Sequence, residues 1–128
     1  ALAHQGVMNP AVLERMEGMT DQADAMKTLG EMATGKVPFD PATALAAREA
    51  LIAAAAETPR LFAAEEFDPR SEARPEIWAE FDRFAEVADR TLAAAHALDT
   101  ADAAALAEGL RVIGETCSAC HEDYRLKN

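Results

Sequence analysis

The sequence predicts an all-α fold, an antiparallel four-helix bundle built as a single domain over residues 1–128. Half of the 128 residues are hydrophobic. Alanine runs dominate that half, and alanine favours helices over strands. Only six glycines and six prolines interrupt the chain, and they separate four stretches of helical length. Four amphipathic helices in a chain of this size bury a core by packing as a bundle.

The first helix is expected over residues 9–34. Asn9 is a suitable N-cap, and Pro10 suits the first helical position, where no backbone N–H is needed. One face then follows a 3-4-3-4 spacing that is typical of a helix packed against partners, and it is formed by Met16, Met19, Ala23, Met26 and Gly30. The helix should end near Gly35, because Pro38 forces an extended exit.

The second helix is expected over residues 41–57, since Asp40 repeats the N-cap signal and Pro59 stops it. The connection from there to Pro75 is long. A connection of this length exceeds a hairpin turn, so we expect it to cross one end of the molecule.

The third helix is expected over residues 75–98 and the fourth over residues 101–125, with Asp99 and Thr100 between them. One apolar stripe marks the third helix, formed by Trp78, Phe81, Ala85, Ala88 and Leu92. These side chains are expected to belong to the core.

The formal net charge is −11 at pH 7, from 23 acidic and 12 basic residues. We therefore expect no binding to nucleic acid or to anionic lipid, because both require a basic face. The simplest interpretation is a solvated surface that keeps the protein soluble, and the alternative is steering toward a basic partner protein. No apolar run approaches the ~20 residues that span a bilayer, so membrane insertion is not expected. The start at Ala1, without an initiator methionine, suggests an exported chain whose signal peptide has been removed.

Both cysteines of the chain lie in one C-x-x-C-H pentapeptide that runs from Cys117 through Cys120 to His121. This pattern is typical of a covalently attached c-type haem. Each thiol forms a thioether with one vinyl group. His121 lies four residues after Cys117 on the same helical face, so its ring can bind the iron as the proximal ligand. One haem c, attached near the C-terminus, is therefore the expected cofactor.

Other interpretations of the two cysteines stay open at this point. A thioredoxin-like pair would begin a helix after a strand, and no strand is apparent here. A zinc site would need a fourth ligand, but His4 and His96 show no ligand spacing to the motif. A structural disulfide or two idle thiols is the simplest alternative. No motif of a hydrolase or a phosphate-binding loop is present, so the protein is not expected to be an enzyme.

The C-x-x-C-H motif at the end of a four-helix chain resembles the cytochrome c prime family, the class II cytochromes c. Tyr124 and Arg125 after the motif and Ile113-Gly114 before it also resemble that family, as do residues 35–40 and 74–78. The resemblance implies a periplasmic haem protein, monomeric or homodimeric, that exchanges electrons with redox partner proteins. It also implies that Tyr124 packs beside the haem and that Arg125 is an exposed cation beside the proximal ligand.

The first helix resembles the low-spin branch of the family. Counted back from residues 35–40, that branch has a haem propionate near Arg15 and a sixth iron ligand at Met19. Its members carry electrons one at a time. From spacing alone, however, methionines on a helix are usually core fillers. Met16, one turn earlier, is the main rival for the ligand position.

Two alternatives accompany this electron-carrier prediction. The first is a high-spin, five-coordinate member of the same family that binds nitric oxide or carbon monoxide at a vacant sixth position. The second is a haem-free helical module in which the C-x-x-C pair is redox-active.

Overall fold

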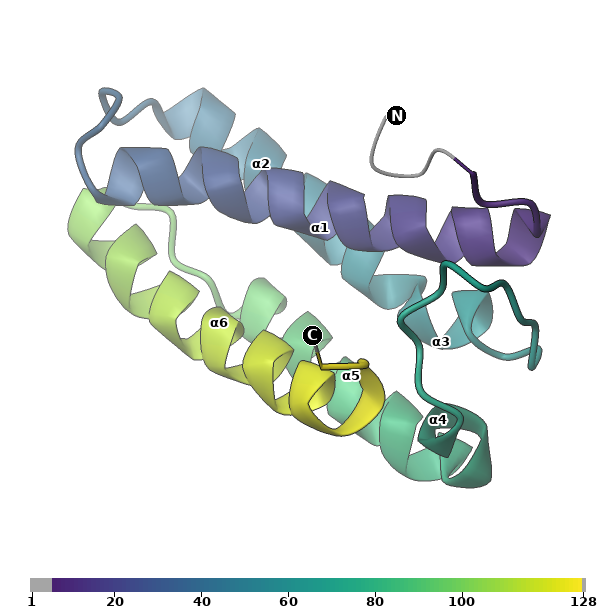
Figure 1. Cartoon of the computed structure of the whole chain (residues 1–128). Coiled ribbons are helices and arrows are strands. Elements are labelled where there is room, and N and C mark those ends of the chain that lie inside the picture. Colours follow the sequence, from purple (N-terminus) through teal and green to yellow (C-terminus); the bar gives the residue numbers. More distant parts are fainter. Residues whose placement is uncertain (1–5, 128) are drawn as a thin grey trace.

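The computed structural model describes residues 6–127 and contains four long helices and two short ones (Figure 1). The long helices are α1 (Pro10–Ala33), α2 (Pro41–Ala56), α5 (Phe81–His96) and α6 (Ala103–Tyr124), and the short ones are α3 (Thr58–Leu61) and α4 (Glu76–Ala79). Helix α1 packs on α2 and α6, and α5 packs on the same two helices. In the described residues the extended structure is limited to one isolated bridge, between Ala73 and Arg125. The all-α four-helix bundle is thus confirmed.

The local signals for the helix ends act as expected. The Asn9 side chain accepts hydrogen bonds from the backbone N–H groups of Ala11 (2.9 Å) and Val12 (3.3 Å) at the start of α1. Asp40 caps α2 in the same way, and its carboxylate accepts from the N–H of Thr43 at 3.0 Å. After α1, Gly35 adopts a φ of 80°, which a residue without a Cβ reaches at little cost.

The third helix differs from the prediction of one continuous element over residues 75–98. It breaks at Glu80, whose φ of −135° and ψ of 49° are not helical, so α4 and α5 are separate. Neither glycine nor proline occupies the break. The Glu80 carboxylate instead binds the Tyr124 hydroxyl group on α6, so the break lies where a tertiary contact holds the chain.

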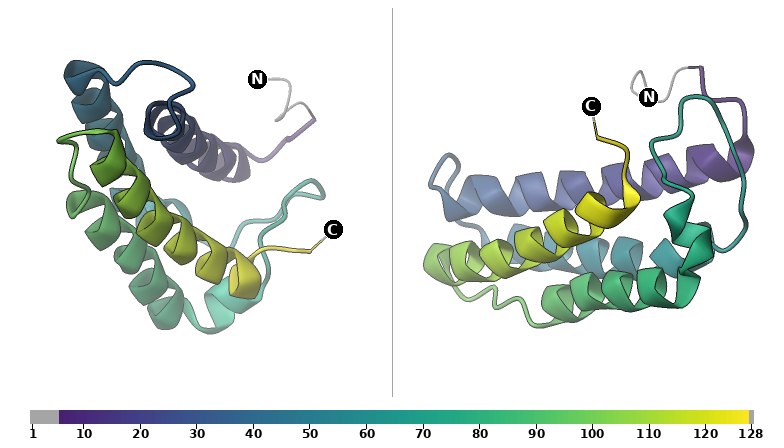
Figure 2. Two further views of the ribbon diagram at one scale, coloured as in Figure 1. Left: turned by 90° about the vertical axis from the view of Figure 1, so that its left-hand side faces the viewer. Right: turned by 60° about the horizontal axis from the view of Figure 1, so that its bottom comes forward.

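The connection after α2 crosses one end of the bundle, as expected, but it is partly helical because α3 lies within it (Figure 2). Hydrogen bonds join it to residues at the start of α1. No helix in the described part of the chain has the length and apolar character needed to cross a membrane.

The main core lies between α1, α2 and α6, where Leu29, Leu51, Leu106 and Ile113 are fully buried. The methionine face of α1 contacts its neighbours in part, because Met26 packs against the main core and Met19 packs against a second cluster around Phe84 and Tyr124. The buried face of α1 consists of Val12, Arg15, Ala25, Leu29 and Met32. The same face also lines a cavity through Met16, Met19, Ala23 and Met26, and the buried residues Val12 and Arg15 line that cavity too.

The buried face of α5 is also shifted from the predicted stripe. It consists of Phe84, Val87, Ala88, Thr91 and Ala95, so Ala88 alone of the expected set is fully buried. Trp78 and Phe81 are partly buried and pack against a second, aromatic cluster. Most residues of the predicted stripe therefore lie at the edge of the core, and only Ala88 lies inside it.

Candidate functional site

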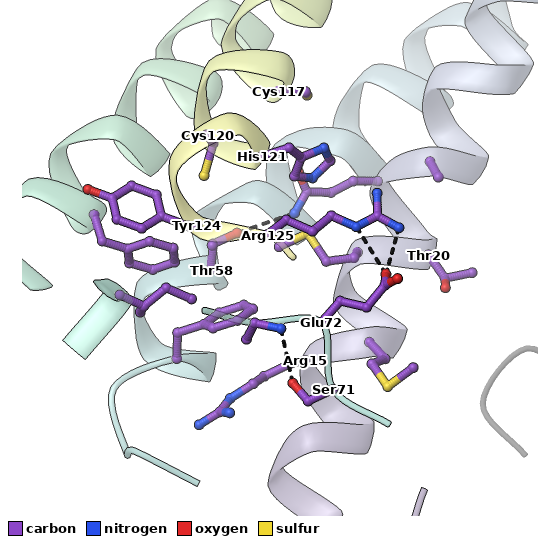
Figure 3. A pocket seen from close by; sticks show the side chains of 18 of the residues that line it. Arg15, Thr20, Thr58, Ser71, Glu72, Cys117, Cys120, His121, Tyr124 and Arg125 are labelled. Atoms are coloured by element: carbon purple, nitrogen blue, oxygen red, sulfur yellow. Dashed lines mark hydrogen bonds and ion pairs between the residues drawn. The ribbon is translucent and has the colours of Figure 1, made fainter. Parts of the chain in front are cut away.

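A cavity of about 530 Å³ lies at the end of the bundle where α3 and α4 are found. A volume of this order is typical of sites for small organic ligands and cofactors. Helix α1 and helix α6 supply most of its lining, and the remainder comes from α3, α4, α5 and the connection between α3 and α4 (Figure 3). The predicted site residues on α1 and on α6, which are about a hundred positions apart in sequence, therefore meet at one cavity.

The two cysteines line this cavity as half-buried free thiols. Burial raises the pKa of Cys117, and burial together with the neighbouring Cys117 raises the pKa of Cys120 to about 11. A nucleophilic or redox-active cysteine needs the opposite shift. In addition, no three His, Cys, Asp or Glu side chains gather as a metal cluster among residues 6–127. These observations disfavour both the dithiol and the zinc interpretations.

His121 lies on the same wall, one turn after Cys117, and stays partly exposed to solvent. Desolvation at the cavity lowers its pKa, and the nearby Arg125 cation lowers it further. Both effects favour the neutral imidazole, which is the form that binds a metal ion. The other two histidines take no part: His96 is exposed at the end of α5, and His4 lies outside the described residues.

Three methionines of α1, at positions 16, 19 and 26, line the cavity from its other side. Met19 packs against the mainly aromatic cluster formed by Phe62, Ile77, Phe84, Val87 and Tyr124. Met26 packs instead against the main core, which sets it apart from the ligand candidates. Met16 and Met19 both remain beside the cavity, so the choice of Met19 stays a prediction.

Arg15 lines the cavity although only 2% of it is exposed. Its guanidinium group donates hydrogen bonds to the backbone carbonyl groups of Leu61 (2.9 Å), Glu66 (3.1 Å) and Ala64. The same group lies 5.2 Å from the ring centre of Phe62 and 5.1 Å from that of Trp78. Arg15 therefore holds the 61–66 segment against α1. The predicted contact with a haem propionate stays a prediction, and guanidinium N–H groups remain for it because a guanidinium has five.

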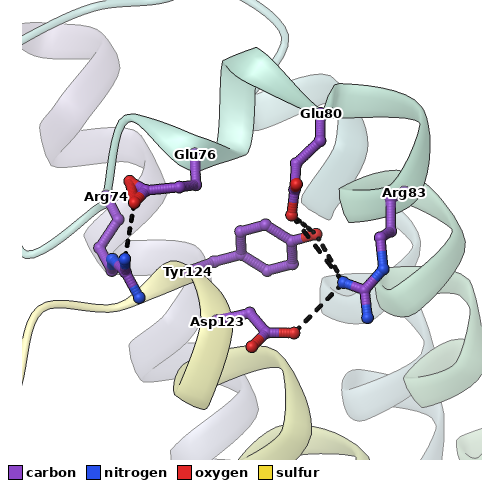
Figure 4. Close-up of polar contacts among 6 residues, drawn as sticks. All are labelled: Arg74, Glu76, Glu80, Arg83, Asp123 and Tyr124. Carbon is purple, nitrogen blue, oxygen red and sulfur yellow. Dashed lines mark hydrogen bonds and ion pairs between the residues drawn. The ribbon is translucent and has the colours of Figure 1, made fainter.

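Tyr124 is buried beside the cavity, and its hydroxyl group is held by two residues of the α4–α5 region (Figure 4). The hydroxyl group lies 2.7 Å from Glu80 Oε1, and Arg83 Nη1 lies 3.3 Å from the hydroxyl oxygen. Arg83 also binds Asp123 at 3.2 Å. Burial and the Glu80 carboxylate raise the pKa of Tyr124 to about 12. This network fixes the last turn of α6, which begins at His121, the final residue of the C-x-x-C-H motif.

Arg125 is exposed beside His121, as the sequence suggested, but it is also paired. Its Nη2 and Nε atoms donate to Glu72 Oε1 at 2.7 and 3.0 Å. Glu72 lines the cavity together with its neighbours Ser71 and Ala73. Sequence reasoning missed all three residues, because they lie in an irregular connection where no periodicity or motif marks a residue that faces a site.

The residues present fit a haem c. Two thiols and an imidazole, the donor set of such a group, face one apolar cavity. Gly114, one turn before the motif, also lines it, and a Cβ added there would meet no atom within 4 Å. Open space at Gly114, three residues before Cys117, leaves room for a flat ring system attached to that cysteine.

Comparison with known proteins agrees with this geometry. A family model described as Cytochrome C' matches residues 10–125. Cytochrome c-556 of Rhodopseudomonas palustris is 34% identical over 120 residues, which cover 85% of this chain and 78% of that protein. Cytochrome c-554 of Cereibacter sphaeroides is 35% identical over an alignment of 137 positions, which covers 100% of this chain and 89% of that protein. A solved structure of a ferrous variant of cytochrome c prime from Alcaligenes xylosoxidans, with bound nitric oxide, has a TM-score of 0.82 at 26% identity and covers 92% of this chain and 94% of that one.

Proposed function

The chain belongs to the cytochrome c' family, whose members carry covalently attached haem c, and on that premise we propose that it transfers single electrons between redox proteins. In this proposal Cys117 and Cys120 hold the haem through thioether bonds. His121 and Met19 would be the two side chains that bind its iron. When bound, the haem supplies one reversible electron, as the iron changes between its ferric and ferrous states.

The observation that carries the proposal is the position of the two ligand candidates on different walls of one cavity. His121 and both cysteines lie on α6, whereas Met19 lies on α1. A thioether ligand favours ferrous iron and raises the reduction potential. The cluster against which Met19 packs makes that side of the cavity apolar, and an apolar surrounding also favours the ferrous, less charged state of the haem.

The surface charge and the family suggest where and with whom the protein exchanges electrons. A net charge of −11 favours encounter with a basic redox partner. A periplasmic location is part of the proposal, and it fits the cytochromes that the chain resembles. Fractionation of cells that express the natural gene tests the location directly.

A five-coordinate protein that binds nitric oxide or carbon monoxide is the second candidate. Two observations favour it: a similar solved structure contains bound nitric oxide, and half-buried methionines such as Met16 and Met19 also serve as simple cavity lining.

Absorption spectra of the ferric and ferrous protein, recorded with and without carbon monoxide, separate the two candidates. A low-spin spectrum that resists carbon monoxide is the expected result. A high-spin spectrum with immediate carbon monoxide binding would establish the second candidate instead. Loss of the haem on extraction with acidified organic solvent would contradict covalent attachment in either case.

A further inference from the structure

At the cavity end of the bundle, α1 and α6 are joined through an irregular segment, residues 68–74, which we call the strap. Away from the cavity the two helices pack directly, through Leu29 and Met32 on α1 and Leu106 and Ile113 on α6. At the other end the cavity lies between them. The strap contributes Ser71, Glu72 and Ala73 to its lining. The strap is therefore one of the connections between the two helices at that end.

Asp68 fastens the first end of the strap to the start of α1. Its side chain is buried, with 3% of the residue exposed. Oδ2 accepts hydrogen bonds from the backbone N–H groups of Met8 (2.8 Å) and Asn9 (3.1 Å), and Oδ1 accepts from that of Arg70 (2.9 Å). Two of these bonds join the strap to the start of α1, and the third, from Arg70, fixes the Asp68 side chain within the strap. Hydrogen bonds to a charged acceptor are about twice as strong as neutral ones.

The second end of the strap is fastened to the turn that follows His121. The N–H group of Arg74 donates to the Tyr124 carbonyl oxygen at 2.9 Å, and the N–H group of Leu126 donates to that of Glu72 at 2.7 Å. The ion pair between Glu72 and Arg125 lies on the same two segments. The strap therefore runs without a break from the cap of α1 to the end of α6.

We propose that Asp68 is a positioning residue for the axial ligands of the haem iron. By holding the strap to α1, it keeps the Met19 side of the cavity at a constant distance from the His121 side. This inference rests on the proposed function, because it concerns a bond from Met19 to the iron. A shift of about 0.5 Å in the position of a ligand residue is enough to weaken its bond to a metal ion. Loosening the strap should therefore let the methionine leave the iron more often.

Asp68→Asn is the variant that tests this role. It keeps the size of the side chain but places an NH2 group against at least one of the three backbone donors. Asp89→Asn is the matched control, since it removes the same charge from an exposed position on α5. Glu72→Gln weakens the other end of the strap. The haem-loaded proteins are compared by their rate of carbon monoxide binding at saturating gas, by their reduction potential and by hydrogen exchange of their amides.

In Asp68→Asn we expect the limiting rate of carbon monoxide binding to rise roughly tenfold, as loss of one hydrogen bond to a charged group would give if only the methionine-bound state contains it. The reduction potential should fall, and the amides of Met8, Asn9 and Arg70 should exchange faster. The effects of Asp68→Asn and Glu72→Gln should not add, because both act through one segment. Asp89→Asn should match the unmodified protein.

The proposal is overturned if Asp68→Asn lowers the unfolding temperature but leaves the carbon monoxide rate and the potential equal to those of Asp89→Asn, since Asp68 would then be merely structural. If instead the proposed electron-carrier function is wrong, the unmodified protein will already have a high-spin spectrum, which distinguishes the two outcomes. In that case hydrogen exchange decides alone: faster exchange in Asp68→Asn at residues 124–126, at the far end of the strap, supports the link, and unchanged exchange there overturns it.

Discussion

The hydroxyl group of Tyr124 lies 2.7 Å from Oε1 of Glu80, and this contact joins the last turn of α6 to the break between α4 and α5. Tyr124 comes three residues after His121. The hydrogen bond to Glu80 therefore links the break between α4 and α5 to the end of α6 that carries the C-x-x-C-H motif. The ring of Tyr124 also packs edge-on to Phe84, with ring centres 5.2 Å apart. The position of the C-x-x-C-H motif thus depends on a residue outside it.

Tyr124→Phe should lower the free energy of unfolding by about 1–2 kcal/mol at pH 7, because it removes the hydroxyl group and leaves Glu80 without that donor. The effect should depend on pH. A pKa raised from its usual ~10 to about 12 stabilises the fold fully below pH 10, and this stabilisation is lost as the pH rises toward 12. The stability difference between Tyr124→Phe and the unmodified protein should therefore shrink over that range, as measured by denaturant unfolding. Tyr124 is the only tyrosine, so its ionisation can be followed by ultraviolet absorbance, and a midpoint near 10 would contradict the contact.

Met19→Ala should leave the fold largely intact, because the haem stays attached at Cys117 and Cys120. It should turn the low-spin spectrum high-spin, lower the reduction potential and admit carbon monoxide. Met16→Ala is the matched control, one turn away on the same cavity wall. If Met16→Ala gives the spectral change and Met19→Ala does not, Met16 is the ligand.

Cys117→Ser should leave the haem held by a single thioether bond at Cys120. After expression with the c-type haem maturation machinery, we expect a lower yield and a cofactor that is lost more readily when the protein unfolds. Intact mass spectrometry checks this, since the unmodified chain should carry the mass of one haem. A mass equal to that of the bare polypeptide would contradict haem attachment altogether.

Electron exchange with a basic redox partner should slow as salt is added, because the net charge of −11 attracts such a partner. At ~0.15 M ionic strength the Debye length is only ~8 Å, so most of the decrease should occur below that concentration. Stopped-flow rates over a range of salt concentrations test this. A rate that is independent of salt would indicate that the acidic surface serves solubility alone.

The sequence by itself determined the features that depend on local chemistry. The helix ends are set by interactions within a few residues, at the N-caps Asn9 and Asp40 and at Gly35. The residue types at these positions were therefore enough to predict where the helices begin and end. The C-x-x-C-H motif is equally local, because Cys117 and His121 share a helical face wherever that helix lies. The fold class followed from the same kind of signal.

Only the tertiary structure decided which helix faces meet and what closes the cavity. The methionine face of α1 has the spacing of a core face, and although Met26 does pack against the main core, the same face also lines a cavity. The break at Glu80 and the paired Glu72 carry no sequence signal, since each is held by a residue more than 40 positions away. Asp68 acts across an even longer separation, 60 residues, to reach Met8. Periodicity and motifs report neighbours along the chain, whereas these contacts exist only after the helices have packed.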